Sequence, residues 1–544
     1  MKKNLFVLFL LLSLSFSTFA QSATKKNSPA MKASVEITAK QLSDYLYFVA
    51  SDEMEGRDTP SRGLDTTAKF IGMNLSRWGF KPAGDNGTFY QKIALRRDVA
   101  DTSKTMLQIG SQKFAFGEDF LRLSGEGTVA NAGIVYGKDG WFVQAKNLDP
   151  YQGVDVKGKI VVLYTEGFPS QRGLTNPPVP RAELKPTERG TTWADPMTYA
   201  KQKGAVGIIL VASPMLQASW EQAKMFLGGG GMYPEKLRDA PAEKSMPVMV
   251  VSRKVGDSIF PIGQNPTKTG ETLPSANLET QANMGVVTKP EIVYTQNVVA
   301  IWEGGDPVLK NEMVAIGAHY DHIGMNPNSP NADKISNGAD DDGSGTVSVL
   351  SIAEALAKSK KRPKRSILLV WHCGEEKGLW GSEYFNKFPT VDIKQVTAQL
   401  NIDMIGRSRK SDSTEPKDKE LSGENAIYVI GSNMMSSKLG EVVANTNKAY
   451  LKMDYDLRFD DPKDPNRFFF RSDHFNYAVN GIPIAFWFDG VHVDYHQVGD
   501  EPSKIDYNKM EKVARTIFLT MWELGDLKER PKIDKELPKE LTQR

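Results

Sequence analysis

Apolar runs alternate with helical stretches from residue 289 onward, and this alternation is the strongest constraint on the fold. The runs are dense in Val, Ile, Leu and Trp, as in strands that are buried on both faces. Between them, residues 346–358 and 510–524 carry apolar side chains at helical spacing. We therefore predict an α/β fold with a mixed, mostly parallel sheet flanked by helices. The predicted strands are 298–302, 313–317, 367–371, 400–404, 427–430 and 484–488.

Residues 110–288 differ from the rest, because short β-branched runs are separated there by glycines. This pattern predicts a compact, β-rich module inserted into the chain. Ahead of it, apolar spacing predicts two helices, at 38–51 and 66–78. The Lys-, Glu- and Pro-rich residues 526–544 are expected to form a charged, solvated tail.

The amino terminus has the features of an export signal. Lys2 and Lys3 precede an apolar run that is too short to span a bilayer, and small residues near Ala20 fit a signal-peptidase site. We expect residues 1–20 to be removed, residues 21–35 to form a linker, and the product to be periplasmic or secreted without a membrane span. Because Cys373 is the only cysteine, an intramolecular disulfide is excluded.

Charge limits the class of partner. The 544-residue chain holds 68 Lys and Arg residues against 66 Asp and Glu residues, and no basic block interrupts this balance. A nucleic acid or an anionic membrane surface is therefore not expected as the main partner. The sequence carries no signal for an oligomeric state.

All six histidines lie between residues 319 and 496. Histidine is the commonest metal ligand and acid/base group near neutral pH, so we expect the chemistry in this window. Five segments within it place an imidazole or carboxylate group at or just after a predicted strand or loop end. These segments are 317–322, 338–345, 373–378, 401–404 and 493–496, and their candidate groups are His319, Asp321, Asp340, Asp341, Asp342, Glu375, Glu376, Asp403 and His496.

Each group alone has a plain structural explanation. A strand-end histidine often makes a single hydrogen bond, and adjacent aspartates are favoured in turns and helix caps. Asp403 is harder to explain in this way, because it lies in an apolar strand where an unpaired carboxylate would be strongly unfavourable. The three adjacent aspartates also repel one another unless solvent or a cation lies close. A shared cation site explains all five segments together.

Two histidines and three carboxylates suit two zinc ions that share one carboxylate and leave room for a shared water. Nitrogen and oxygen donors without sulfur favour Zn²⁺ and leave Co²⁺ or Mn²⁺ as alternatives. Spacing alone does not separate Asp340, Asp341 and Asp342 as the shared ligand. His474 is either a residue that lines the substrate pocket or a structural histidine with one hydrogen bond.

In order and spacing, these segments resemble the co-catalytic di-zinc aminopeptidase family, which also contains glutamate carboxypeptidases and glutaminyl cyclases. Glu55-Gly-Arg57 resembles the lead-in of that family, which makes 36–109 the amino-terminal part of the catalytic domain 289–525. Residues 110–288 resemble the protease-associated domain that some members carry. The resemblance rests on His319-Tyr-Asp321, Gly338 to Gly345, Gly374-Glu-Glu-Lys-Gly378, Asn401-Ile-Asp403 and Tyr495-His496.

The resemblance also implies roles for individual residues. Glu375 would be the general base, taking a proton from the shared water and passing it to the leaving amine. Asp321 would orient His319 through the second ring nitrogen. The family pattern further implies a cis peptide after the shared aspartate. Asp341 would be the shared ligand, with His319 and Asp403 completing one metal position and Glu376 and His496 the other.

The expected function is that of an exported zinc exopeptidase, an aminopeptidase acting on peptides. A glutamate-type carboxypeptidase shares the motifs, but such enzymes carry a long helical dimerisation segment, for which we expect no room after residue 524. A glutaminyl cyclase is disfavoured by the complete ligand set. A receptor-like binding protein on the same scaffold should have lost ligands, whereas all five are present here.

Overall fold

The computed structural model describes residues 28–164, 174–227, 231–238, 246–266, 273–327, 329 and 332–542. The predicted signal peptide lies outside these residues. The chain forms two compact units: unit 1 contains Met1–Ala94 and Val293–Arg544, and unit 2 contains Leu95–Ile292. In the part of the chain that is described, no helix combines the length and apolarity needed to cross a membrane.

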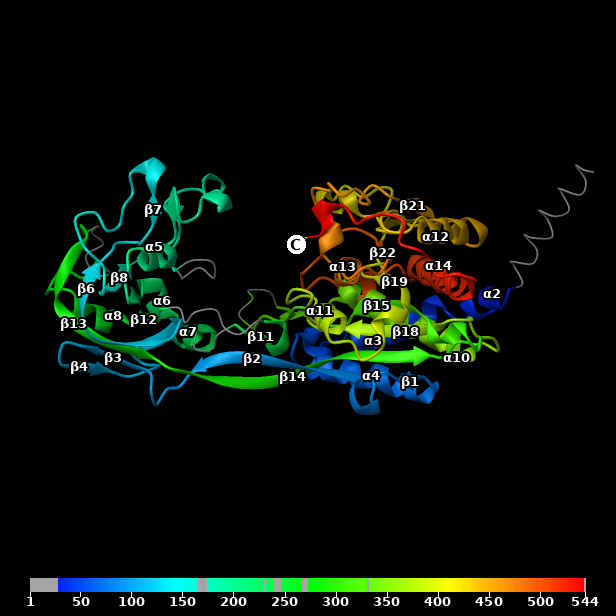
Figure 1. The fold of residues 1–544 in the computed structure, drawn as a ribbon, viewed down its shortest axis with the longest axis horizontal. Coiled ribbons are helices and arrows are strands. Elements are labelled where there is room, and N and C mark those ends of the chain that lie inside the picture. The colour runs from blue at the N-terminus through cyan, green and yellow to red at the C-terminus, as the bar shows by residue number, and fades with distance from the viewer. Residues whose placement is uncertain are drawn as a thin grey trace, which may run out of the picture. The chain divides into compact units, whose positions relative to one another are not determined.

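Unit 1 is built on a mixed sheet whose central strands are parallel. Neighbouring strands follow the order β14-β18-β15-β19-β22-β20-β21 (Figure 1). β18, β15, β19 and β22 run parallel, while β14 and β20 pair with them in the antiparallel sense. The mixed α/β fold predicted from the apolar runs is confirmed. The strands are β14 (Thr288–Trp302), β15 (Met313–His319), β18 (Ser366–His372), β19 (Val396–Ile402), β20 (Ala426–Ile430), β21 (Asp454–Asp456) and β22 (Ile484–Phe488).

Helices cover both faces of this sheet, which explains why its central strands are apolar throughout. On one face, α10 (Gly345–Lys358) and α14 (Tyr507–Asp526) pack against β15. The Trp371 indole N–H donates to the carbonyl of Thr346 on this face, at 3.0 Å. On the other face, Leu368 and Val370 belong to a core that includes residues of α11 (Trp380–Lys387) and α13 (His474–Val479).

The amino-terminal segment of unit 1 packs on the helices of the first face. α3 (Ala39–Val49) begins at Thr38, whose hydroxyl accepts from the Gln41 N–H at 3.2 Å, and it contacts α10 and α14. The predicted linker 21–35 is wrong in its described part, because α2 (Pro29–Ser34) forms there. Ser28 caps α2, and Ala30 and Ala33 are buried against α14 and α10. Two alanines are enough to pack this short helix against its neighbours. Two small apolar residues in a polar segment do not, however, form an apolar pattern that predicts a helix.

The described part of the predicted tail also differs from expectation. Arg530 pairs with Glu312 at 3.1 Å, the Asp534 N–H donates to the Met435 carbonyl at 3.1 Å, and Leu541 is only 2% exposed. A solvated tail is therefore wrong for these residues. Their charged side chains remain outward while the backbone and Leu541 pack on unit 1.

Unit 2 contains an eight-stranded mixed sheet, ordered β4-β3-β13-β6-β8-β10-β12-β5. Its central strands are apolar on both faces: Ile209 and Val211 pack into one core, and Ile208 and Leu210 into another. Unit 2 spans 95–292, whereas the predicted bounds were 110–288. The bounds differ because β2 (Tyr90–Ala100) and β14 continue from one unit into the other, so the composition does not change at the boundaries. The strands are β3 (Met106–Ile109), β4 (Gln112–Phe114), β5 (Phe120–Ser124), β6 (Gly127–Tyr136), β8 (Ile160–Tyr164), β10 (Gly207–Val211), β12 (Val248–Val251) and β13 (Ala276–Val286), and the helices are α5 (Pro196–Gln202), α6 (Pro214–Ala218), α7 (Trp220–Leu227) and α8 (Arg253–Ile259).

Candidate metal centre

The candidate residues come together at the carboxyl ends of the four parallel strands of unit 1. His319 ends β15, Glu375 and Glu376 follow β18, Asp403 follows β19, and His496 lies on the loop after β22. Asp341 lies in the short helical turn η8 (Ala339–Ser344), directly before α10. Parallel strands bring their carboxyl ends to one edge of a sheet, so residues far apart in sequence meet there.

Asp341 lies between two groups of donor atoms. Its Oδ1 is 3.2 Å from His319 Nε2, which in turn is 3.7 Å from Asp403 Oδ2. Its Oδ2 is 3.1 Å from His496 Nε2, and the same nitrogen is 3.1 Å from Glu376 Oε2. Within each group, the potential ligand atoms all lie within 4.8 Å of one another. One carboxylate therefore has an oxygen directed at each group.

The geometry separates the three adjacent aspartates, which spacing alone did not. Asp342 accepts backbone N–H bonds from His319, Gly345 and Met404 at 2.8–3.2 Å, so its carboxylate holds the loops. Asp340 accepts from the Gly406 N–H at 2.7 Å and lies 3.4 Å from His492 Nε2. Only the Asp341 carboxylate belongs to both donor groups. The peptide between Asp341 and Asp342 is cis, as the family pattern implied.

His322 belongs to the second group, although the candidate groups named from the sequence do not include it. Its Nδ1 is 2.8 Å from Glu376 Oε1 and 3.8 Å from Asp341 Oδ2, and the residue is fully buried. The Nδ1 and the Glu376 Oε1 are not aligned for a hydrogen bond, and each lacks another partner among the described residues. The sequence signal that could have identified His322 as a potential ligand is its position three residues after His319, in a segment that contains other candidate ligands.

The clustered carboxylates raise the pKa values of two histidines. Burial lowers the pKa of His496, but hydrogen bonds and charge from Asp341 and Glu376 outweigh it and raise this pKa to about 10. Burial likewise opposes protonation of His319, yet Asp403, Asp321 and Asp341 raise its pKa well above the usual range. A site that holds protons this tightly is strongly attractive to cations.

Glu375 and Asp321 lie beside the donor groups. Burial raises the pKa of Glu375 well above its ordinary value; His319 opposes this shift, and the Glu376 and Asp403 carboxylates add to it. The Glu375 N–H donates to Asp321 Oδ1 at 3.2 Å. The Nδ1 of His319 lies 3.1 Å from the backbone carbonyl of Asp321 and 3.6 Å from its carboxylate. The backbone oxygen of Asp321 is thus the nearer partner of this ring nitrogen.

Arg57, from the Glu55-Gly-Arg57 motif, holds the loops that carry these residues. Its fully buried guanidinium donates to four backbone carbonyls, at 2.7–2.9 Å. Two of them, Asn337 and Gly338, precede η8, and a third, Tyr320, follows His319. One cation therefore ties the His319 loop to the Asp341 turn, a role that the sequence did not indicate.

Comparison with known proteins agrees with this geometry. Residues 297–521 match the model of Peptidase family M28. This segment belongs to Peptidase family M28.

The relatives of the M28 segment are aminopeptidases by name. A probable leucine aminopeptidase 2 from Aspergillus oryzae is 26% identical over 272 residues, which cover 46% of this chain and 49% of the relative. Leucine aminopeptidase 2 from Trichophyton rubrum is 27% identical over 214 residues, covering 39% of this chain and 37% of the relative. The chain thus spans about half or less of the length of these curated relatives.

Two solved structures are similar over most of the chain. The aminopeptidase from Aneurinibacillus sp. strain AM-1 has a TM-score of 0.47 at 16% identity, covering 93% of this chain and 97% of that one. A zinc aminopeptidase from Bacillus subtilis has a TM-score of 0.46 at 16% identity, covering 93% and 99%.

The donor set of the M28 segment fits zinc. The two groups offer imidazole nitrogens and carboxylate oxygens, and neither group includes Cys373, which is buried elsewhere. Such a set favours Zn²⁺, with Co²⁺ or Mn²⁺ as alternatives. The unaligned contact between His322 and Glu376 supports this fit, because atoms that share an ion approach closely without hydrogen bonding to each other.

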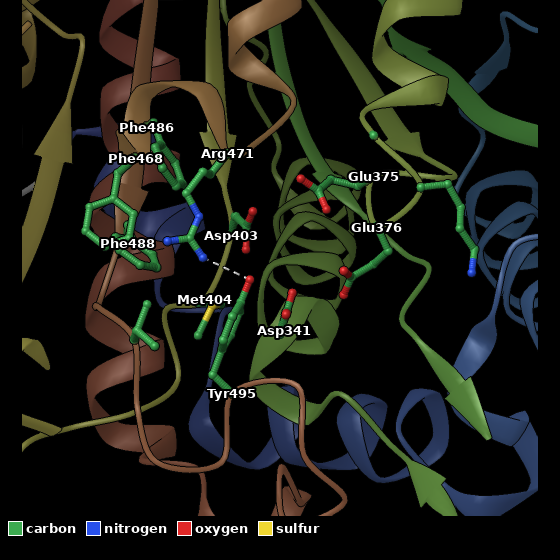
Figure 2. A pocket seen from close by; sticks show the side chains of 13 residues that line it. Asp341, Glu375, Glu376, Asp403, Met404, Phe468, Arg471, Phe486, Phe488 and Tyr495 are labelled. Atoms are coloured by element: carbon green, nitrogen blue, oxygen red, sulfur yellow. Dashed lines mark hydrogen bonds between the residues drawn. The ribbon is translucent and has the colours of Figure 1, made fainter. Parts of the chain in front are cut away.

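A cavity of about 400 Å³ opens onto the donor groups of the M28 segment. Asp341, Glu375, Glu376 and Asp403 form one wall, and Phe468, Phe486 and Phe488 form the opposite one (Figure 2). His474, for which the sequence left open a pocket position and a structural role, does not line this cavity. It is fully buried, its ring stacks on Phe486 at 4.4 Å, and burial lowers its pKa to about 3. His474 is the first residue of α13, and its buried ring packs against the cavity-lining residue Phe486.

Proposed function

We propose that the protein is an exported, zinc-dependent exopeptidase, specifically an aminopeptidase that releases residues from the amino terminus of peptides. The observation that carries this proposal is the meeting of two donor groups at Asp341, with Glu375 at the same cavity. Membership of the M28 segment in a peptidase family and the names of its relatives support it.

Each of these residues has a role in the proposal. His319, Asp341 and Asp403 would hold one zinc ion, and Asp341, Glu376 and His496 would hold the other, with His322 as an additional donor. Bound zinc supplies Lewis acidity for the scissile carbonyl and makes a water acidic enough to ionise near neutral pH. Glu375 would serve as the general base, taking a proton from the attacking water and delivering it to the leaving amine. Asp321 holds the His319 ring and the Glu375 backbone in place.

The cavity holds charges of both signs. Four carboxylates line it, three of them among the proposed zinc ligands, and Lys377 and Arg471 line it as well. The names of the relatives, which are aminopeptidases, favour the aminopeptidase over the glutamate-type carboxypeptidase.

Removal and return of zinc test the proposal. The full chain, dialysed against a chelator, should lose release of leucine from Leu-Leu-Leu, and stoichiometric zinc should restore it. Acetylation of the peptide amine should stop the reaction. Hydrolysis that continues on the acetylated peptide would identify a carboxypeptidase, and a zinc-loaded protein without hydrolysis on any unblocked peptide would leave a binding protein.

Two further parts of the proposal concern regions outside the centre. We propose that residues 1–20 are a cleaved export signal, which amino-terminal sequencing of the natural protein would test. We also propose that unit 2 is a protease-associated-like module, since it contains residues 110–288, which resemble that domain, and has the parallel strands β8 and β10 in its sheet.

A further inference from the structure

Two cationic side chains line the cavity, and only one of them has a carboxylate partner. Lys377 Nζ lies 2.6 Å from Asp58, so its charge is already paired. Arg471 is exposed to the cavity, and no carboxylate of the described residues forms an ion pair with its guanidinium. Arg471 therefore presents to the cavity a positive charge that no carboxylate of the described residues neutralises.

Neighbouring rings hold the Arg471 guanidinium in place. Its Nη2 donates to the Tyr495 hydroxyl at 3.1 Å, the contact drawn as a dashed line in Figure 2. The guanidinium carbon lies 5.0 Å from the ring centre of Phe468 and 5.6 Å from that of Tyr495, both within the range of cation–π attraction. A guanidinium has five N–H donors, and only one is used here by a side chain. The remaining donors form a preorganised site for an anion.

Tyr495 links this cation to the metal centre. Its ring stacks on the imidazole of His496, with ring centres 4.0 Å apart. Arg471 thus lies next to the apolar rings and across the cavity from Glu375 and Glu376 (Figure 2).

We propose that Arg471 binds a carboxylate of the peptide substrate. The carboxylate is either the free carboxyl terminus of a short peptide or an acidic side chain of its first residue. Arginine is suited to this role because its planar fork binds both oxygens of a carboxylate. The inference rests on the proposed aminopeptidase function and adds a substrate class to it: short or acidic peptides are preferred over their neutral analogues.

Two pairs of substrates distinguish the source of the carboxylate. The first pair is Leu-Leu and Leu-Leu-amide, which differ only at the carboxyl terminus. The second pair is Glu-Leu-amide and Gln-Leu-amide, which differ only in the first side chain. The zinc-loaded wild-type protein should show kcat/KM roughly ten- to a hundredfold higher for the acid than for the neutral member of one pair, the range expected of a charge-assisted hydrogen bond.

Arg471→Gln removes the charge and retains an amide for the Tyr495 hydroxyl. It should reduce the ratio of kcat/KM between the acid and the neutral member of the pair to within about twofold of unity. Arg471→Lys should recover part of the preference, since it restores charge without the fork. Arg467→Gln is the matched control, because Arg467 also lies over a phenylalanine ring, Phe470, but does not line the cavity. It should leave the preference unchanged.

The outcomes separate this inference from the function on which it rests. If no peptide of either pair is hydrolysed, the aminopeptidase proposal fails. If acids and amides of both pairs are hydrolysed equally by the wild type, or if Arg471→Gln keeps the wild-type preference, the role of Arg471 is wrong and the aminopeptidase proposal stands. The comparison within the wild type needs no variant, so poor folding of a mutant does not block the test.

Discussion

The two units bury polar side chains in different ways. In unit 2, the buried residues Asp195, Ser213 and Ser252 each cap a helix by accepting a backbone N–H. In unit 1, the buried groups around Asp341 face one another, and Glu376 Oε1 and both nitrogens of His322 have no hydrogen-bond partner among the described residues. Burial of a polar group is thus no sign of function by itself. What distinguishes the unpartnered atoms of His322 and Glu376 is that they also belong to a group of potential metal ligands.

Among substitutions at the buried polar groups of the two units, Glu375→Gln in unit 1 should have the largest effect. The substitution keeps the size of the side chain and removes its capacity to accept a proton, so kcat should fall by roughly a hundred- to ten-thousandfold. Zinc content, measured by elemental analysis, should stay as in the wild type. Glu383→Gln on α11, where Glu383 pairs only with Lys387, is the control and should retain activity. Full activity of Glu375→Gln would remove this residue from its assigned role.

Asp341→Asn should weaken zinc binding at both positions by at least about a hundredfold, because one carboxylate oxygen faces each donor group. The metal-free protein should lose thermal stability near neutral pH, because His319 and His496 hold the pKa of Asp341 well below its ordinary value and the charged carboxylate therefore stabilises the fold. Zinc titration followed by calorimetry measures the first effect, and thermal unfolding in chelator the second. Two intact zinc sites in this variant would contradict the shared-ligand assignment.

His322→Asn should weaken one of the two zinc positions, by roughly ten- to a hundredfold, and leave the other unchanged. The reason is that His322 belongs only to the group with Glu376 and His496. His474→Phe is the matched control, a buried histidine outside both groups. Equal weakening of both positions would show that His322 acts on the fold instead of on one ion.

Asp195→Ala probes the other kind of buried polar group. Asp195 accepts from the Thr198 N–H at 3.1 Å as the cap of α5, so its loss should destabilise unit 2 by about 1 kcal/mol. Denaturant unfolding, with a probe in unit 2, measures this change. Zinc affinity should be unaffected, and a loss of zinc in this variant would break the contrast between the units.

Asp460 shows what burial alone does to a carboxylate in unit 1. Burial raises its pKa from 3.8 to about 6, against the opposing effects of the Gly431 N–H and Lys535. The folded state therefore binds this proton more tightly than the unfolded state, and stability falls as the pH rises from 3.8 to about 6. Asp460→Asn should flatten stability over this window and raise it above pH 6, by up to about 1 kcal/mol after allowance for partial exposure. Unchanged slopes in thermal melts across this range would contradict the shift.

Much of the fold was predictable from the sequence. The apolar runs at 313–317 and 484–488 coincide with β15 and β22, and the helix expected at 346–358 is α10. Such elements are visible because burial on both faces leaves a continuous apolar signal. α2 was missed for the opposite reason: it docks through two alanines, which give no clear pattern in a polar segment.

The candidate site was only partly predictable. The strand-end positions of His319, Glu376 and Asp403 were enough to expect that they meet. The sequence left open whether His474 lines the substrate pocket or has a structural role. In the structure its ring stacks on Phe486, and His474 does not line the cavity. The direction of a side chain at the start of a helix depends on packing that spacing does not encode.

The sequence by itself determined the kinds of donor, their order along the chain and the sheet edge to which they belong. The tertiary structure decided that Asp341, and neither of its two neighbours, faces both donor groups, and that His322 belongs to one of these groups. It also decided that Arg471 forms no ion pair with a carboxylate of the described residues. The physical reason is that periodicity reports only whether a residue is buried or exposed. Which atoms approach within 3–4 Å depends on how loops from four strands pack against one another, and no single segment carries that information.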